Sequence, residues 1–292
     1  MLLQCNGQLI WKQVLAYLNY MHSNYCANCT HLLKPEQNFC ENCGQQAAIH
    51  RISFGHVIHE GVHFLTHADK GIFYLLKQLA VRPGHVAREY IEGKRKKYMP
   101  PVNFFLIMVG LFVLASSTFK TFERPGNFAE VKKILAKEPN EVIRERRLAK
   151  INRAEQTTKF MGKNSNLVSL LVAIPFVTLI FFLFNIRRKY NYTEHLVANF
   201  YFAGFSALFF ILLVAPLSHF INSAQFYFSA ISGFLFFEII YRSIAYYQFT
   251  NKKGIKHYLF ALFPSIISVV LWSVLSYTII QFYIDTGFKN LF

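Results

Sequence analysis

Charged residues are scarce in this sequence, and acidic residues are the scarcest. Asp, Glu, Lys and Arg account for 16% of the 292 residues, and only 15 acidic side chains stand against 31 basic ones. Hydrophobic residues account for 53% and aromatic residues for 17%. So little charge beside so much apolar surface excludes an ordinary soluble domain and indicates a membrane protein.

Two further features are absent. Residues 1–20 lack a basic n-region and a small-residue cleavage site, so they do not resemble a signal peptide. We interpret them either as an N-terminal extension, since Met21 directly precedes the first motif, or as a short helix on the membrane surface. The chain also lacks a convincing pair of nucleophile and base, which argues against an enzyme.

Long apolar runs begin only after Pro101, and each is about long enough to cross a hydrocarbon core of roughly 30 Å as a helix. Backbone amides in lipid must be satisfied within their own segment. We therefore predict an all-α integral membrane protein with about five transmembrane helices and an N-terminal cytosolic head. The predicted spans are 102–119, 167–186, 196–219, 226–247 and 258–283, and the first is short enough to be re-entrant or interfacial instead.

Lysine and arginine gather before the first predicted span, between the second and third, and between the fourth and fifth. By the positive-inside rule, this places the N-terminus in the cytoplasm and the C-terminus outside. The segment 120–166 disagrees, because it would lie outside yet carries 12 Lys and Arg against six Glu. We leave its side open. Since the basic residues follow the predicted membrane edges, the net charge of +16 indicates anionic lipid head groups and no nucleic acid.

The cysteines give the strongest chemical signal. Cys26, Cys29, Cys40 and Cys43 have the spacing C-x2-C-x10-C-x2-C, which is typical of a structural zinc site with four sulfur ligands. No ligand position stays open for water, so the zinc should be structural. Iron in a similar cage, or two disulfides in an exported domain, are the alternatives.

A histidine-rich helix is expected next, over residues 53–79, with one polar and one apolar side that suit the membrane interface. Within it, "HEGVH" matches H-E-x-x-H, and His59, His63 and His67 follow one another at single-turn spacing. A second metal site or a pH-sensing role is one hypothesis for them. The simpler interpretation is a solvated polar face, because Gly61 weakens the helix and no outside ligand is evident.

The juxtamembrane segment, residues 82–101, should begin with a helix break at Pro83 and continue as a short basic helix. We predict that its cations contact lipid head groups. These residues are Arg88, Lys94, Arg95, Lys96 and Lys97.

Charged and polar residues also lie inside the predicted spans, where they are costly and often functional. A polar pocket could form from Glu194, His195, Asn199, Glu238 and Arg242. Alternatively, Glu238 and Arg242 neutralise each other at i, i+4, and Glu194 only caps its helix.

Three stretches resemble the bacterial zinc-ribbon membrane proteins of the family called domain of unknown function 3667. They are "FCENCGQ", "DKGIFYLLKQLAVRPGHVAREYIEGKRKKYMPP" and "YNYTEHLVANFYF". The resemblance implies a cytoplasmic ribbon and a multi-span domain in the bacterial cytoplasmic (inner) membrane, but no activity. The expected organisation is an extension or surface helix at 1–20, the zinc ribbon at 21–48, the amphipathic helix and juxtamembrane segment at 49–101, and the membrane domain at 102–292 with a charged loop at 120–166.

Together these features favour a membrane-anchored zinc-ribbon adaptor that recruits a cytosolic protein. A transporter or lipid-handling protein that uses the polar pocket is the alternative, and an H-E-x-x-H metallohydrolase is a remote third. The sequence does not decide whether the protein forms a homo-oligomer.

Overall fold

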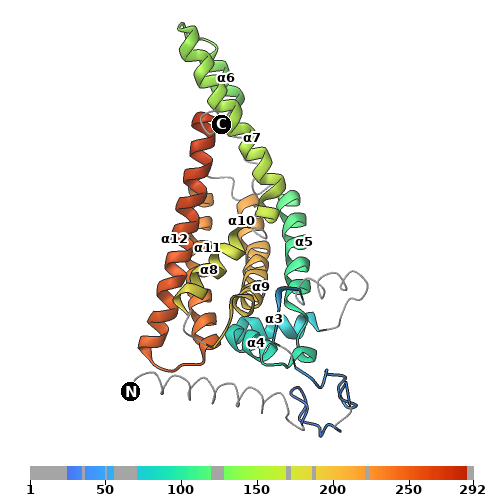
Figure 1. The fold of residues 1–292 in the computed structure, drawn as a ribbon. Coiled ribbons are helices and arrows are strands. Elements are labelled where there is room, and N and C mark those ends of the chain that lie inside the picture. Colours follow the sequence, from blue (N-terminus) through green and yellow to red (C-terminus); the bar gives the residue numbers. More distant parts are fainter. Residues whose placement is uncertain are drawn as a thin grey trace, which may run out of the picture.

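The computed structural model describes residues 25–34, 37–49, 51–55, 71–119, 128–168, 172–185, 189–220 and 224–287. Figure 1 shows a tapering helical bundle with the ribbon at its broad end and the hairpin of α6 and α7 at the other. The helices are α3 (Ile72–Val81), α4 (Pro83–Ile91), η2 (Arg95–Lys97), α5 (Pro101–Phe119), α6 (Phe128–Leu135), α7 (Glu141–Val168), α8 (Ile174–Phe184), α9 (Tyr192–Phe209), the π-helical turn η4 (Phe210–Val214), α10 (Ala215–Phe220), α11 (Ala224–Thr250) and α12 (Ile255–Thr286).

The all-α prediction is confirmed for the described residues, which contain no strand longer than an isolated bridge. Among the described residues, three helical segments are long and apolar enough to cross a membrane, namely Arg95–Phe119, Tyr192–Leu217 and Ile255–Thr286. They coincide with the first, third and fifth predicted spans. The two other predicted spans fall on α8, which has 11 residues, and on α11, which carries Glu238 and Arg242.

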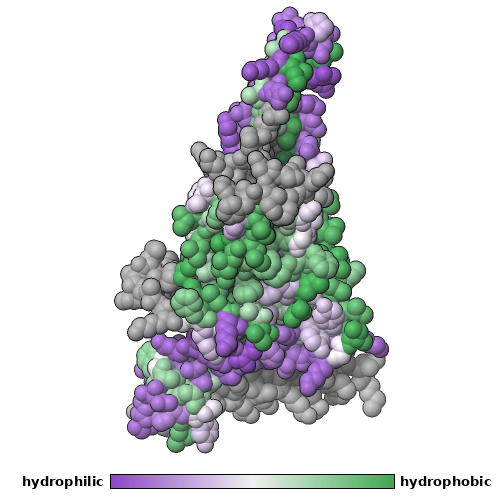
Figure 2. Space-filling view, turned by 180° about the vertical axis from the view of Figure 1, so that it is seen from behind, coloured by the Kyte–Doolittle hydropathy of each residue, from purple (hydrophilic) through white to green (hydrophobic). Residues whose placement is uncertain are grey.

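The surface agrees with a membrane protein. Figure 2 shows apolar side chains gathered over the middle of the bundle, between a polar edge beside the ribbon and the polar α6 and α7 hairpin. Exposed apolar residues on α5 and α12, such as Leu114 and Val274, contribute to this belt. Such a continuous apolar surface between two polar ends is suited to lipid.

The segment 120–166 is not simply the charged loop that the sequence suggests, because α6 and α7 occupy most of it. Within and between these helices, Glu155 accepts hydrogen bonds from Lys132 at 2.6 Å and Lys159 at 2.8 Å. Arg153 of α7 donates to the carbonyl oxygen of Ile284 at 2.7 Å, at the end of α12. The charges therefore stabilise a helical hairpin and cap α12, instead of keeping the segment unfolded.

The core lies where α4, α5, α9 and α11 converge, next to the ribbon. Tyr90 of α4 packs edge-on against Tyr201 of α9, with ring centroids 5.8 Å apart. On α9, Gly204 allows close approach to α5, since an added Cβ would lie 2.6 Å from Cε1 of Phe104. Small residues at such contacts let helices in lipid pack closely.

Gly84 sets the contact between α4 and α11. A Cβ at this position would lie 2.0 Å from the carbonyl oxygen of Ala245 and 2.4 Å from the backbone nitrogen of Phe249. These are backbone atoms, so they cannot move away without a shift of the helix. We expect Gly84→Ala to destabilise the bundle by about 2–4 kcal/mol, at or above the usual range for overpacking. Thermal melting in detergent measures the effect. Gly110→Ala, where nothing lies within 4 Å, is the matched control, and equal melting of both variants would contradict this packing.

Candidate metal centre and buried polar network

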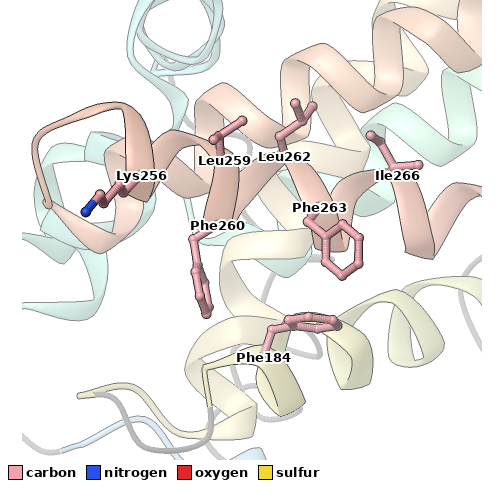
Figure 3. Close-up of a pocket in the computed structure, with 7 residues that line it drawn as sticks. All are labelled: Phe184, Lys256, Leu259, Phe260, Leu262, Phe263 and Ile266. Atoms are coloured by element: carbon pink, nitrogen blue, oxygen red, sulfur yellow. The ribbon is translucent and has the colours of Figure 1, made fainter.

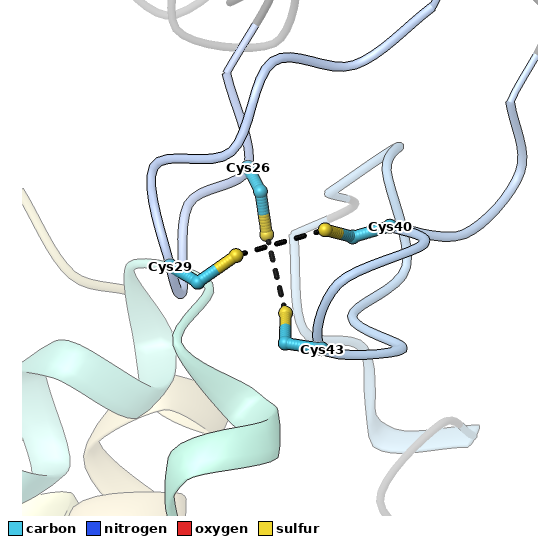
Figure 4. A group of neighbouring side chains, drawn as sticks. All are labelled: Cys26, Cys29, Cys40 and Cys43. Atoms are coloured by element: carbon cyan, nitrogen blue, oxygen red, sulfur yellow. Dashed lines mark hydrogen bonds between the residues drawn. The ribbon is translucent and has the colours of Figure 1, made fainter.

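The four cysteines of the ribbon come together at one point. Their sulfur atoms all lie within 4.8 Å of one another. The Sγ atoms of Cys26 and Cys43 are 3.6 Å apart, as are those of Cys29 and Cys40, and Figure 4 shows all four converging. Such a set of four thiol groups could hold one metal ion with tetrahedral sulfur coordination and no open position.

Two similar knuckles build this centre. In the first, the backbone N–H of Thr30 donates to the carbonyl oxygen of Cys26 at 2.8 Å, and in the second Gly44 donates to Cys40 at the same distance. Both turns end with a positive φ, 60° at Thr30 and 68° at Gly44. Glycine accepts this conformation readily, which is the role expected of Gly44, whereas a β-branched residue such as Thr30 adopts it rarely.

The thiol groups differ in their electrostatic surroundings. A hydrogen bond from the backbone N–H of His31 lowers the pKa of Cys29 to about 6, whereas burial raises the pKa of Cys26 to about 12. A bound cation would stabilise all four thiolates and release the remaining protons. The site is therefore suited to a metal ion in its chemistry as well as in its geometry.

The ribbon is fixed to the helical body from one side. Oε1 of the buried Gln45 accepts a hydrogen bond from the backbone N–H of Lys96 at 3.0 Å. Farther along, Arg51 forms a two-pronged ion pair with Glu194, at 3.0 Å from Nε and 3.1 Å from an η nitrogen. Bidentate pairs of this kind hold both position and orientation.

Glu194 also caps α9, as one of the two interpretations of the sequence predicts. Its backbone N–H donates to the side chain of Asn191 at 2.8 Å, and its carboxylate accepts from the backbone N–H of Asn191 at 2.7 Å. This capping box starts α9 at Tyr192, four residues before the predicted span, because it satisfies the first free N–H groups of the helix.

The ribbon also carries exposed apolar side chains. Tyr25 is 58% exposed, Leu32 60% and Phe39 63%. Tyr25 and Leu32 face each other across an isolated bridge, and Phe39 occupies the matching bridge of the second knuckle. Large exposed apolar residues on so small a module are characteristic of interaction surfaces.

In the juxtamembrane segment, predicted lipid-contacting cations also bind protein groups, as Arg88, Lys94 and Lys97 do. Arg88 donates to the carbonyl oxygen of Gln248 at 2.9 Å. Lys94 and Lys97 pair with Glu89, at 3.4 and 2.7 Å. Lys96 is exposed, and Arg95 is partly buried beside it. Their contact with lipid remains a prediction, and part of the positive charge is neutralised within the protein.

Glu89 is the anionic centre of this segment. Burial by itself would raise its pKa, but hydrogen bonds from Lys97 and Tyr98 and the charge of Lys94 lower the pKa to about 2. The ionised carboxylate is therefore the form that the folded protein favours, and it holds α4 and η2 together.

We expect Glu89→Gln to lower stability at pH 7 by about 1–2 kcal/mol, because hydrogen bonds to the charged group are lost. A carboxyl group with a depressed pKa stabilises the fold above its unfolded pKa. The difference between wild type and variant should thus shrink as the pH falls from about 4.5 toward 2. Melting temperatures across this range test it. The exposed Glu145→Gln is the control, and a difference independent of pH would show that the ionised form is not responsible.

The structure brings together only part of the predicted intramembrane set. Nη1 of Arg242 donates to Oδ1 of Asn199 at 3.0 Å, and Nε of Arg242 pairs with Glu238 at 2.5 Å. Asn199 also donates to Thr178 at 3.1 Å and to the hydroxyl of Tyr246 at 2.7 Å. Asn199 is therefore the centre of a network that joins α8, α9 and α11, while Glu194 lies apart beside Arg51.

The imidazole of His195 is not hydrogen-bonded to this network, although its ring stacks on that of Tyr246 with centroids 5.9 Å apart. It is 1% exposed, and neither ring nitrogen has a hydrogen-bond partner among the described residues. Aromatic rings surround it instead, with centroids from 5.6 Å (Phe249) to 6.4 Å (Tyr190) away. The five predicted residues thus separate into a cap, an aromatic-enclosed histidine and a hydrogen-bonded network.

Sequence analysis missed Arg51, Thr178 and Tyr246, which complete these contacts. None of them belongs to a motif, and Arg51 lies 143 positions before its partner. For Arg51, the only available signal in the sequence was its position as a basic residue just after the ribbon. His59, His63 and His67 lie outside the described residues, as does the extension at 1–20.

Comparison with known families supports one part of the chain. The profile of the family described as "Protein of unknown function (DUF3667)" matches residues 69–113. This confirms the resemblance over the segment that holds α3, α4, η2 and most of α5. The match includes neither the four cysteines nor the Asn199 network. No curated protein and no solved structure matches the chain.

Proposed function

We propose that this protein is a membrane-anchored adaptor, whose zinc-bound ribbon presents a docking surface for a cytosolic protein. The observation that carries the proposal is the exposure of apolar side chains on a ribbon that is held to the bundle. Gln45, and Arg51 just after the ribbon, bind the helical body, and the apolar residues Tyr25, Leu32 and Phe39 are exposed. A closed metal site gives such a surface rigidity without offering a catalytic position.

The proposed setting is a bacterial cytoplasmic membrane, crossed five times, with the N-terminus in the cytoplasm and the C-terminus outside. Three helices in the described part of the chain are long and apolar enough to cross a membrane. We assign the predicted span 167–186, which contains α8, and the helix α11 to the other two crossings. The start of α5, the start of α9, the end of α11 and the start of α12 lie at the ribbon end of the bundle (Figure 1). In the sequence, the basic residues predicted to face the cytoplasm precede or follow these helix ends.

Site-specific photocrosslinking in cells tests the docking surface. A crosslinker at Leu32 or Phe39 should capture a cytosolic protein, and one at Leu114 on α5 should not. Leu32→Ser with Phe39→Ser should abolish the capture and reproduce the deletion phenotype, while the metal content stays unchanged. If the double variant kept full function, or if no capture depended on the ribbon, the adaptor role would be wrong.

A transporter or lipid-handling protein is the second candidate. The buried His195, with both nitrogens unpartnered among the described residues, favours it, since such groups inside a membrane often serve a ligand or proton path. The other members of the predicted pocket, Asn199, Glu238 and Arg242, are hydrogen-bonded to one another, which favours a structural role for these three residues. Ribbon-deleted protein that still complements a deletion strain would favour this candidate over the adaptor.

A further inference from the structure

An apolar groove of about 410 Å³ lies between α8 and the first turns of α12. Its volume is within the range of roughly 300–1,000 Å³ that is common for small-molecule sites. Figure 3 shows Phe260 and Phe263 pointing from α12 toward Phe184 on α8, with Lys256 at one end and Ile266 at the other. The rings of Phe184 and Phe263 meet edge-on at 5.8 Å.

The length of the groove matches one leaflet. Lys256 and Ile266 are ten residues apart, so the groove follows α12 for about 15 Å. This is half of a hydrocarbon core of roughly 30 Å. The groove begins at the basic edge of the bundle and runs toward its apolar middle, which is the path of an acyl chain that hangs from the membrane surface.

Positive charge is concentrated at the Lys256 end of the groove. Lys252, Lys253 and Lys256 are all exposed, and no carboxylate in the described part of the chain pairs with them. The N-terminus of α12 adds its positive dipole end there, and Gly254 provides no side-chain cap.

We infer that this groove binds one anionic phospholipid, with an acyl chain along Phe260, Phe263 and Ile266 and the phosphate at Lys256 and the start of α12. The charge complementarity selects an anionic head group, and the apolar walls select a hydrocarbon chain. The inference rests on the proposed placement of α12 across the bilayer, but it is independent of the adaptor role, because the groove lies apart from the ribbon.

Native mass spectrometry of the full-length protein in detergent tests the head-group preference. Phosphatidylglycerol and phosphatidylcholine with identical acyl chains are titrated separately. Wild type should bind one phosphatidylglycerol more tightly than phosphatidylcholine. Lys256→Gln should weaken that phosphatidylglycerol about five-fold, as expected for one lysine at the membrane surface. The exposed Lys137→Gln on the far hairpin should leave it unchanged.

The acyl-chain path needs a second pair of variants. Ile266→Trp fills the groove and should weaken the tightest-bound lipid of either type, whereas Val274→Trp, also exposed on α12 but farther along, should not. The inference would be overturned if wild type bound the two lipids equally, or if the two variants of a pair had equal effects. It would also be overturned if Ile266→Trp changed the oligomeric state instead of weakening lipid binding. None of these results would bear on crosslinking at the ribbon.

Discussion

Cys26→Ser is expected to abolish metal binding and unfold the ribbon, while the helical bundle remains folded. The described ribbon contains two isolated bridges and few buried side chains, so it has little core of its own. Metal binding in such modules contributes on the order of 10 kcal/mol to folding. Without it, the contacts of Gln45 and Arg51 with the bundle cannot order the rest of the ribbon.

Metal analysis and limited proteolysis measure this change. Wild type should contain one zinc per chain, and Cys26→Ser none, with new cleavage within residues 25–49 and an unchanged melting temperature for the bundle. Cys5→Ser, the same replacement at the cysteine outside the two C-x2-C pairs of the sequence, is the control. Zinc retained by Cys26→Ser would refute the assignment, and a second equivalent retained after loss of the cluster would indicate a site at His59, His63 and His67.

Arg242→Met should be the most destabilising change in the membrane body, at about 3–5 kcal/mol. The variant leaves the carboxylate of Glu238 largely buried without its partner, which lies at 2.5 Å in the wild type. It also removes the donor to Asn199. Replacing both charged residues, as Glu238→Met with Arg242→Met, should recover part of this stability, because a removed ion pair costs less than a broken one.

Thermal melting of both variants gives the comparison, and the surface pair of Glu141 and Arg144 is the control. Its charged atoms are 3.6 Å apart, and Glu141 is well exposed while Arg144 is partly exposed, so Arg144→Met should cost at most about 1 kcal/mol. If Arg242→Met lowered the melting temperature by no more than Arg144→Met does, the buried network would not be a stabilising unit. If the double variant were stable but could not complement a deletion strain, the network would serve function, as the transporter hypothesis requires.

Much of the candidate metal centre was predictable because it is local. The two C-x2-C pairs fix which sulfur atoms can meet, and a short knuckle needs only a residue that tolerates a positive φ after the second cysteine. The long apolar runs likewise predict α5, α9 and α12, since a lipid-embedded backbone has few alternatives to a helix. The long helix α7 of the charged hairpin was harder to predict, because it is polar on all sides, has no periodic apolar pattern and depends on ion pairs such as Lys132 with Glu155.

The sequence by itself determined that this is a membrane protein, that long apolar helices include the first, third and fifth predicted spans, and which four cysteines could hold a metal. Only the tertiary structure decided that Glu194 binds Arg51 across 143 positions, that Asn199 connects three helices, and that Phe184 closes a groove against α12. The reason is physical. Local sequence patterns indicate which side chains avoid water. The partners of those side chains depend on how helices distant in the sequence pack together. Close contacts such as that of Gly84 with α11 determine this packing.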